Sequence, residues 1–216
     1  MSAKNKKLKR EPGKHRGMAY EFGIYYVISS VKLLIGSIIV AVLFCMMKVP
    51  AVFPILSILA VILPIISAIR YVKDMPRNFR KYCAENNIDY AEIEQEWEKS
   101  VVYRSQGSVI AMGDKHLILN TGAYKWENIL WIYDTVIYVE NFKRAKIPTD
   151  HLRVCLDNGN TIDVTFSLMD AIVFINDVKK EHPEIVVGYD AKLNVMYHNY
   201  IEEFKSRAHS LQDRDY

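Results

Sequence analysis

The sequence predicts an α+β protein in which an N-terminal transmembrane helical hairpin precedes a curled antiparallel sheet or partial barrel with C-terminal helices. Three observations support this class. Two long apolar runs stand near the start of the 216-residue chain, with charged residues gathered around them. From about residue 100, apolar residues recur with the period of two that is typical of strands. After residue 167 the apolar spacing becomes helical again.

The stronger transmembrane candidate is the second apolar run, Val49–Ile69. It holds no charged residue and is bounded by Lys48 and Arg70. A helix rises about 1.5 Å per residue, so a run of this length covers roughly 31 Å, the thickness of the hydrocarbon core of a bilayer. The sequence therefore predicts a membrane-spanning helix here.

The first apolar run, Leu33–Met47, is shorter and needs residues 24–31 and Lys32 to reach a spanning length. A lysine near the end of a span extends its stem to the interface at low cost. The alternative for Lys32 is an intramembrane ion or proton site. Because only a few residues separate the two runs, we expect a tight helical hairpin over residues 24–72.

The charge around the hairpin predicts its orientation. A basic tail, residues 1–23, carries a net charge of +5, and residues 70–81 carry +4. Positive residues stay on the cytoplasmic side, so both ends are expected in the cytoplasm of a multi-pass protein of the cell (inner or plasma) membrane. The bilayer is then one partner, and we expect four membrane-interface residues: Lys32, Lys48, Arg70 and Lys73.

The segment 73–99 is predicted to be a helical juxtamembrane linker. One helix is expected from Asp74-Met75-Pro76 to about Cys83, because proline suits a first turn. Asn86-Asn87 interrupts it, and Asp89 then heads a capping box that opens a helix to about Glu98.

Residues 100–206 are predicted to form the cytoplasmic domain, with 207–216 as a tail. Six or seven short strands are expected, with the clearest hairpin signals at Gly113-Asp114 and Asn158-Gly159-Asn160. Two helices capped by Ser167 and Asp190 follow. Residues 82–216 carry a net charge of −8, so a nucleic-acid partner is not expected.

Four segments carry a resemblance to a known layout: Ala111-Met112-Gly113-Asp114, Ile129–Tyr133, Asn158-Gly159 and His182–Tyr189. Over roughly residues 80–205 the chain resembles an uncharacterised bacterial family with two transmembrane helices and a C-terminal pleckstrin-homology-like (PH-like) domain. The resemblance implies a PH-like fold and carries no catalytic residue. The early loops have little positive charge, so phosphoinositide binding is not expected.

Two groups of residues are candidates for binding a lipid or a partner. Lys143, Arg144 and Lys146 make the one basic loop of the domain, which suits anionic lipid or an acidic partner. The alternative is a solvated turn. Trp126 and Trp131 belong to an aromatic-rich segment that is either a recognition groove or the core of the sheet.

No catalytic, metal or cofactor motif stands out in the sequence. Cys155 and His151 share a face of one expected strand, which leaves a hydrolase as a remote alternative. We therefore expect no cofactor. The leading hypothesis is a non-enzymatic, membrane-anchored interaction module that binds a protein, peptide or lipid. The open edge of the sheet can accept an added strand, which would be the mechanism of binding. The main alternative is an accessory subunit of a membrane complex, or a small transport component, that acts through the transmembrane hairpin.

Overall fold

The computed structural model describes residues 17–47, 50, 52–140 and 146–212. The chain divides into two compact units, residues 1–100 with 120–122, and residues 101–119 with 123–216.

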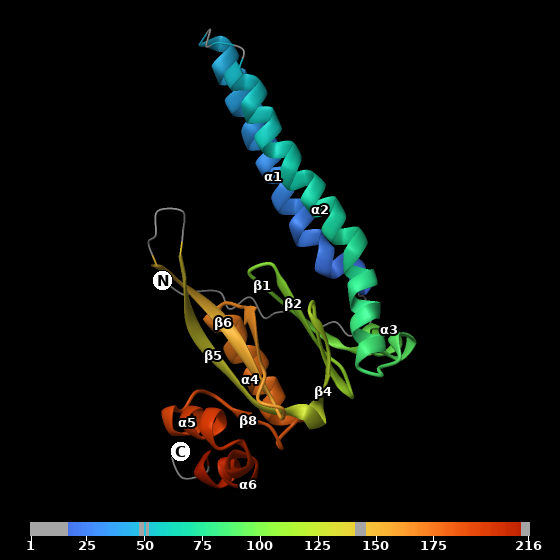
Figure 1. The fold of residues 1–216 in the computed structure, drawn as a ribbon, viewed down its shortest axis with the longest axis vertical. Coiled ribbons are helices and arrows are strands. Elements are labelled where there is room, and N and C mark those ends of the chain that lie inside the picture. Colours follow the sequence, from blue (N-terminus) through green and yellow to red (C-terminus); the bar gives the residue numbers. More distant parts are fainter. Residues whose placement is uncertain (1–16, 48–49, 51, 141–145, 213–216) are drawn as a thin grey trace, which may run out of the picture. The chain divides into compact units, whose positions relative to one another are not determined.

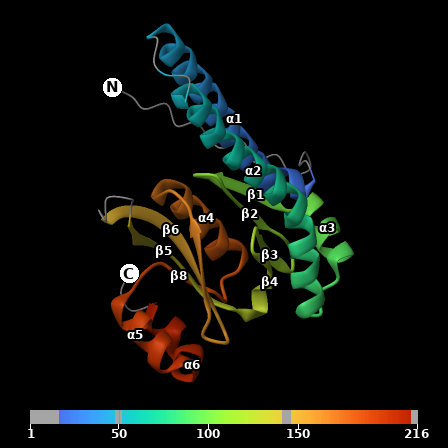
Figure 2. The same cartoon turned by 45° about the horizontal axis from the view of Figure 1, so that its top comes forward.

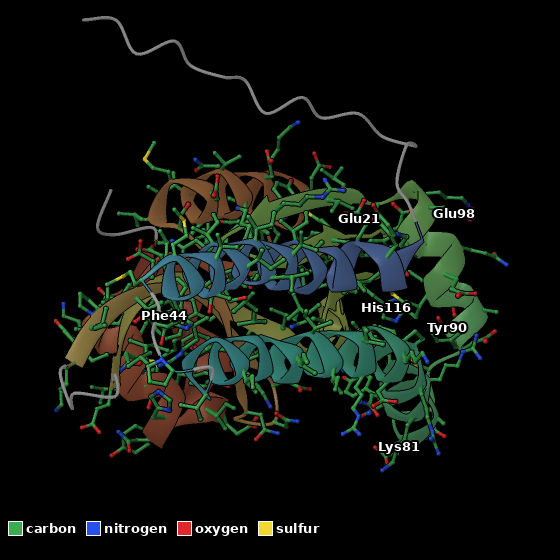
Figure 3. The ribbon with its side chains drawn as sticks, turned by 90° about the horizontal axis from the view of Figure 1, so that it is seen from above. Glu21, Phe44, Lys81, Tyr90, Glu98 and His116 are labelled. Carbon is green, nitrogen blue, oxygen red and sulfur yellow. The ribbon has the colours of Figure 1, made fainter. Side chains whose placement is uncertain are left out.

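The first unit consists of three helices, α1 (Met18–Met46), α2 (Val52–Glu85) and α3 (Tyr90–Lys99). Helices α1 and α2 run side by side as an antiparallel pair (Figures 1 and 3). Helix α3 begins where expected, because the Asp89 carboxylate accepts a hydrogen bond from the Ala91 N–H. Before it, Asn87 ends α2 with a positive φ of 55°.

The structure corrects the prediction of a membrane hairpin. In the ranges that the structure describes, none of the helices combines the length and the apolar character needed to span a membrane. The predictions of a transmembrane hairpin and of a multi-pass cell-membrane protein are wrong on this finding, and the transport alternative depended on that hairpin. The apolar run and the charged segment after it were expected to be separate elements, whereas α2 is one helix of 34 residues that continues through Arg70, Lys73 and Asp74.

The same finding removes the reason for naming membrane-interface residues. Lys32, Arg70 and Lys73 are exposed on α1 and α2. Lys48 lies outside the described residues. The expected helix start at Asp74 is also wrong, because Pro76 lies inside α2 and the helix passes through it without a break.

The second unit confirms the α+β class, with two four-stranded sheets in place of one curled sheet. The strand order is β1-β2-β3-β4 in the first sheet and β7-β6-β5-β8 in the second. The strands are β1 (Val101–Ser105), β2 (Ser108–Met112), β3 (His116–Leu119), β4 (Gly122–Lys125), β5 (Ile129–Glu140), β6 (Lys146–Leu156), β7 (Thr161–Thr165) and β8 (Val186–Val187).

The helices of this unit are α4 (Leu168–Glu181), α5 (Ala191–Asn199) and α6 (Ile201–Gln212), and a short 3-10 helix, η1 (Trp126–Asn128), leads into β5. Ser167 and Asp190 cap α4 and α5 as expected. The single last helix that was expected is instead two, because the backbone leaves the helical region at Tyr200. The chain is still helical where a tail was predicted from residue 207.

The second sheet has a hydrophobic core on each face, because side chains alternate along its strands. Ile132 and Leu152 face a core shared with α4 and the first sheet. Trp131 and Cys155 face a core closed by α5 and α6. Figure 2 shows α4 beside the β5–β6 pair, with α5 and α6 together near the C-terminal end of the unit. Both faces of the sheet are therefore covered near the start of β5.

Candidate functional site

Strands β5 and β6 are longer than their neighbours and form a projecting two-stranded ribbon. They pair antiparallel from Trp131↔Cys155 to Glu140↔Lys146. Strand β8 pairs with β5 only at Trp131 and Ile132, and β7 pairs with β6 only from His151 onward. Figure 1 shows β5 and β6 running together past β8. We call residues 134–140 and 146–150 the ribbon.

The hydrogen-bonding direction of β5 follows from its contact with the segment after β8. The Ile132 carbonyl accepts a hydrogen bond from the Gly188 N–H at 2.9 Å, so the peptide groups of Ile132 point away from β6. Direction alternates along an antiparallel strand. The N–H and C=O groups of Asp134, Val136, Tyr138 and Glu140 therefore also point away from β6, and no strand of the described residues pairs with them.

The opposite edge of the ribbon differs in chemistry. The Asp150 carbonyl accepts from the Phe166 N–H at 3.1 Å, so alternate residues of β6 point outward on that side. Pro148 occupies the next such position and has no N–H to donate. Proline at an outward position is a known way to prevent pairing at a sheet edge. The edge of β5 is thus the one suited to an added strand.

The ribbon exposes large apolar side chains on both faces. The exposed fractions are 50% for Val136, 64% for Tyr138, 50% for Val139 and 48% for Ile147. Single exposed apolar residues are ordinary on protein surfaces, but contiguous ones mark interaction sites. Cross-strand pairing places Val139 directly opposite Ile147 on one face, and Val136 and Tyr138 are neighbours two residues apart on the other face.

Helix α4 begins on the same face of the ribbon as Val136 and Tyr138. Asp150 is the cross-strand partner of Val136, and its carboxylate accepts a hydrogen bond from the Leu168 N–H at 3.3 Å. Leu168, Met169 and Ile172 are exposed in the first turns of α4. Their apolar side chains therefore extend the surface of the ribbon onto the helix.

A ladder of polar side chains crosses the sheet at the base of the ribbon. Arg153 donates to both carboxylate oxygens of Asp163, and this pair raises the pKa of the guanidinium. Tyr133 stands opposite Arg153 on β5, and burial raises the pKa of its phenol while a hydrogen bond to Arg153 lowers it. The ladder joins β5, β6 and β7, so the ribbon projects from a fixed base.

Both tryptophans that the sequence analysis named are in the core. Trp131 is 0% exposed and donates from its indole Nε1 to the Gly188 carbonyl at 2.7 Å. Trp126 is 5% exposed, donates to the Gly113 carbonyl at 2.8 Å and stacks on His182 with 3.9 Å between ring centroids. Neither ring is exposed to a partner, so these two tryptophans belong to the core.

The basic loop is described only at its end. Lys143 and Arg144 lie outside the described residues. Lys146 is exposed at the start of β6 and stands opposite Glu140. An acid opposite a base is a favourable cross-strand pair. Lys146 thus lies at the start of β6, on the ribbon itself.

Cys155 and His151 do not form a catalytic pair. Cys155 is fully buried, and burial raises the pKa of its thiol to about 12. A thiol with that pKa is protonated at neutral pH and is a poor nucleophile. The His151 ring lies within hydrogen-bonding distance of the Thr149 carbonyl and of the Thr165 hydroxyl instead.

The sequence contained a signal for the ribbon that its period alone did not identify. Residues 136–139 read Val-Ile-Tyr-Val, which places apolar residues on both faces of a strand. A strand with one solvated face normally alternates apolar and polar residues. An apolar run without alternation indicates either a strand buried on both faces or a strand with an exposed apolar face that can bind a partner.

One comparison with known proteins gave a match. A family model, described as a domain of unknown function (DUF6709), matches residues 74–197. No curated protein matches significantly, and the same holds for the solved structures. The matched range includes the ribbon, all of α4 and most of α5.

Proposed function

We propose that this chain, which belongs to the DUF6709 family, is a non-enzymatic interaction module that binds an extended peptide segment of a partner protein as an added strand on β5. The single observation that carries the proposal is the outer edge of β5. There the peptide groups of alternate residues, from Asp134 to Glu140, point away from β6 without a strand partner in the described ranges. Main-chain hydrogen bonds along that edge supply affinity for an extended segment.

The side chains around the edge supply the contact surface. An added strand would place alternate side chains beside Val136 and Tyr138, on the face where α4 begins. Exposed Leu168 and Met169 lie at that helix start. Burying apolar area of this kind stabilises a complex by about 25 cal/mol per Å² before the costs of association.

The asymmetry of the ribbon supports the choice of edge. Pro148 makes the outer edge of β6 a poor acceptor of a strand, whereas β5 has no proline along its length. A lipid partner is the alternative that the basic residues Lys143, Arg144 and Lys146 suggested. The peptide reading is favoured because the described part of this surface is apolar and strand-like.

The order of strands supports the proposed PH-like resemblance. Four strands in sequence order form one sheet, the next three form the second, and a helix follows. Strand β8, parallel to β5, is an addition to that order. This resemblance concerns architecture and adds no ligand to the proposal.

The test is binding of a fluorescently labelled synthetic peptide, with alternating valine and threonine, to the full chain by fluorescence anisotropy. Val136→Pro removes an outward N–H of β5 and is expected to weaken binding roughly tenfold, since each lost hydrogen bond is worth about 1 kcal/mol and proline also distorts the ladder. The matched control is Pro148→Val, which adds an N–H on the other edge and is expected to leave binding unchanged.

A peptide with N-methyl groups at alternate positions provides a second control, because it cannot donate along one edge. Strand addition predicts that methylation of one alternate set abolishes binding and that methylation of the other set does not. Equal binding by all these peptides and by Val136→Pro, each confirmed as folded by circular dichroism, would overturn the proposal.

A further inference from the structure

The outer edge of β5 carries a charge pattern as well as peptide groups. Its outward positions are Asp134, Val136, Tyr138 and Glu140, so two apolar side chains stand between two acids. All four side chains lie on one face of the sheet, because they are two residues apart. This face is the one on which α4 begins, as the bond from the Leu168 N–H to Asp150 shows.

We infer that β5 selects a basic partner strand, with lysine or arginine opposite Asp134 and Glu140 and apolar residues between them. The inference rests on the proposed strand addition and names the chemistry of the segment that is added. Residues opposite each other on paired strands contact directly, and unlike charges there are favourable. The complementary segment therefore has two basic residues six positions apart and two apolar residues at alternate positions between them.

The two acids are not equivalent. Glu140 stands opposite Lys146 on β6, which already offsets its charge. Asp134 stands opposite buried Leu152, and the nearest acid along that face of β6 is Asp150. A base opposite Asp134 therefore meets a more negative environment than a base opposite Glu140, so we expect Asp134 to dominate the selection.

A second copy of this chain fits the edge poorly. Antiparallel self-pairing over the full length of the edge is centred on Ile137, because that register covers residues 134 to 140 in both copies. It places Asp134 of each copy opposite Glu140 of the other. Like charges directly opposite are unfavourable in a ladder, so the edge disfavours its own copy and favours a basic segment of another protein.

The experiment compares two labelled synthetic peptides with the full chain at low salt. One has lysine at both flanking positions around alternating valines, and the other has glutamate there. We expect the lysine peptide to bind roughly fivefold more tightly or better, as exposed cross-strand charge pairs allow. The preference is expected to shrink in high salt, because exposed charges are screened.

Charge reversal on the chain is the second arm. Asp134→Lys is expected to remove or invert the preference, and Glu140→Lys is expected to reduce it less. The matched control is Asp114→Lys, a charge reversal at an exposed turn of the other sheet, which should keep the preference of the unmodified chain. If Asp134→Lys fails to fold, the comparison of the two peptides on the unmodified chain still decides the matter.

The possible failures are separable. If both peptides bind equally and Val136→Pro weakens both, strand addition stands and the basic selection is overturned. If Val136→Pro changes the affinity for neither peptide, the proposed function itself has failed. Concentration-dependent dimerisation through the edge, seen by analytical ultracentrifugation and abolished by Val136→Pro, would replace the basic partner with a second copy and overturn the inference.

Discussion

Arg153 holds Asp163 through two hydrogen bonds, from Nε to Oδ1 at 2.6 Å and from Nη2 to Oδ2 at 2.8 Å. The two residues face each other across β6 and β7, and Arg153 also stands opposite Tyr133 on β5. This two-point contact ties together the three strands from which the ribbon projects. The pair is about a quarter exposed, so its contribution is larger than that of a surface ion pair and smaller than that of a buried one.

Removing one member of this pair should destabilise the second unit. Asp163→Asn keeps the shape of the side chain and removes its charge, and we expect the free energy of unfolding to fall by about 1–2 kcal/mol. Urea denaturation measures the change, and Asp114→Asn at an exposed turn is the control for loss of one acid. An unchanged midpoint in Asp163→Asn would show that the pair contributes nothing to stability.

The buried thiol of Cys155 predicts a loss of stability at alkaline pH. Burial raises its pKa from 9.0 to about 12, so the unfolded chain releases this proton at lower pH than the folded chain does. The stabilisation is therefore fully present below pH 9 and is lost as pH rises from 9 towards 12. At pH 10 the loss from this group amounts to about 1.4 kcal/mol.

The measurement is the free energy of unfolding at pH 8 and pH 10, with the cysteines kept reduced. Cys155→Ala lacks the titrating group, so its loss between the two pH values should be smaller than that of the unmodified chain by about 1.4 kcal/mol. The phenols of Tyr133 and Tyr197 also have raised pKa values, chiefly because they are buried, so both proteins lose further stability over this pH range. Identical losses in the two proteins would contradict the burial of Cys155.

The cap of α4 provides a third prediction. The Ser167 hydroxyl accepts from the Asp170 N–H at 3.3 Å and donates to the Asp170 carboxylate at 2.6 Å. Ser167→Ala removes both bonds, and the free energy of unfolding should fall by about 1 kcal/mol. Ser167→Thr, which keeps a hydroxyl that can accept and donate, is the control and should recover much of the loss. Equal stability of the alanine and threonine variants would show that the cap is not formed.

Two aromatic residues of β5 should behave in opposite ways. Trp131 is fully buried, so Trp131→Ala is expected to lower the free energy of unfolding by about 3–5 kcal/mol. Tyr138 is 64% exposed, so Tyr138→Ser should cost less than about 0.5 kcal/mol and should weaken peptide binding instead. Calorimetry and fluorescence anisotropy on the same samples separate the two effects. If Trp131→Ala were as stable as the unmodified chain but bound peptide less tightly, the result would support the alternative that Trp131 lines a recognition groove.

Much of the second unit follows from local sequence signals. Ser167, Asp190 and Asp89 cap helices where the sequence predicts caps. The Asn158-Gly159 turn joins β6 and β7, and Gly159 has the positive φ of 82° that such a turn requires. These features depend on a few adjacent residues, so a sequence is sufficient to identify them.

The remaining features depend on contacts that are distant in sequence. Trp131 is buried because the chain returns to it through Gly188 and Phe204. The separation of two sheets and the parallel pairing of β8 with β5 are likewise long-range. The prediction of a membrane hairpin relied on the length of two apolar runs and placed Arg70 and Lys73 at the membrane interface, whereas α2 continues through both as one helix. The ribbon was not predicted, because it exists only where β5 and β6 extend beyond β7 and β8, and those relative lengths depend on pairing between distant segments.

The central claim is that β5 receives a strand, and amide hydrogen exchange of the full chain with the lysine-flanked peptide tests it most directly. The amides of Val136 and Tyr138 point away from β6, so they should exchange quickly in the free chain and become protected in the complex. The Ile137 amide points toward β6 and should change little. Protection of Val136 and Tyr138 without a comparable change at Ile137 is the result predicted here. Binding that leaves both amides exchanging as quickly as before would contradict the account.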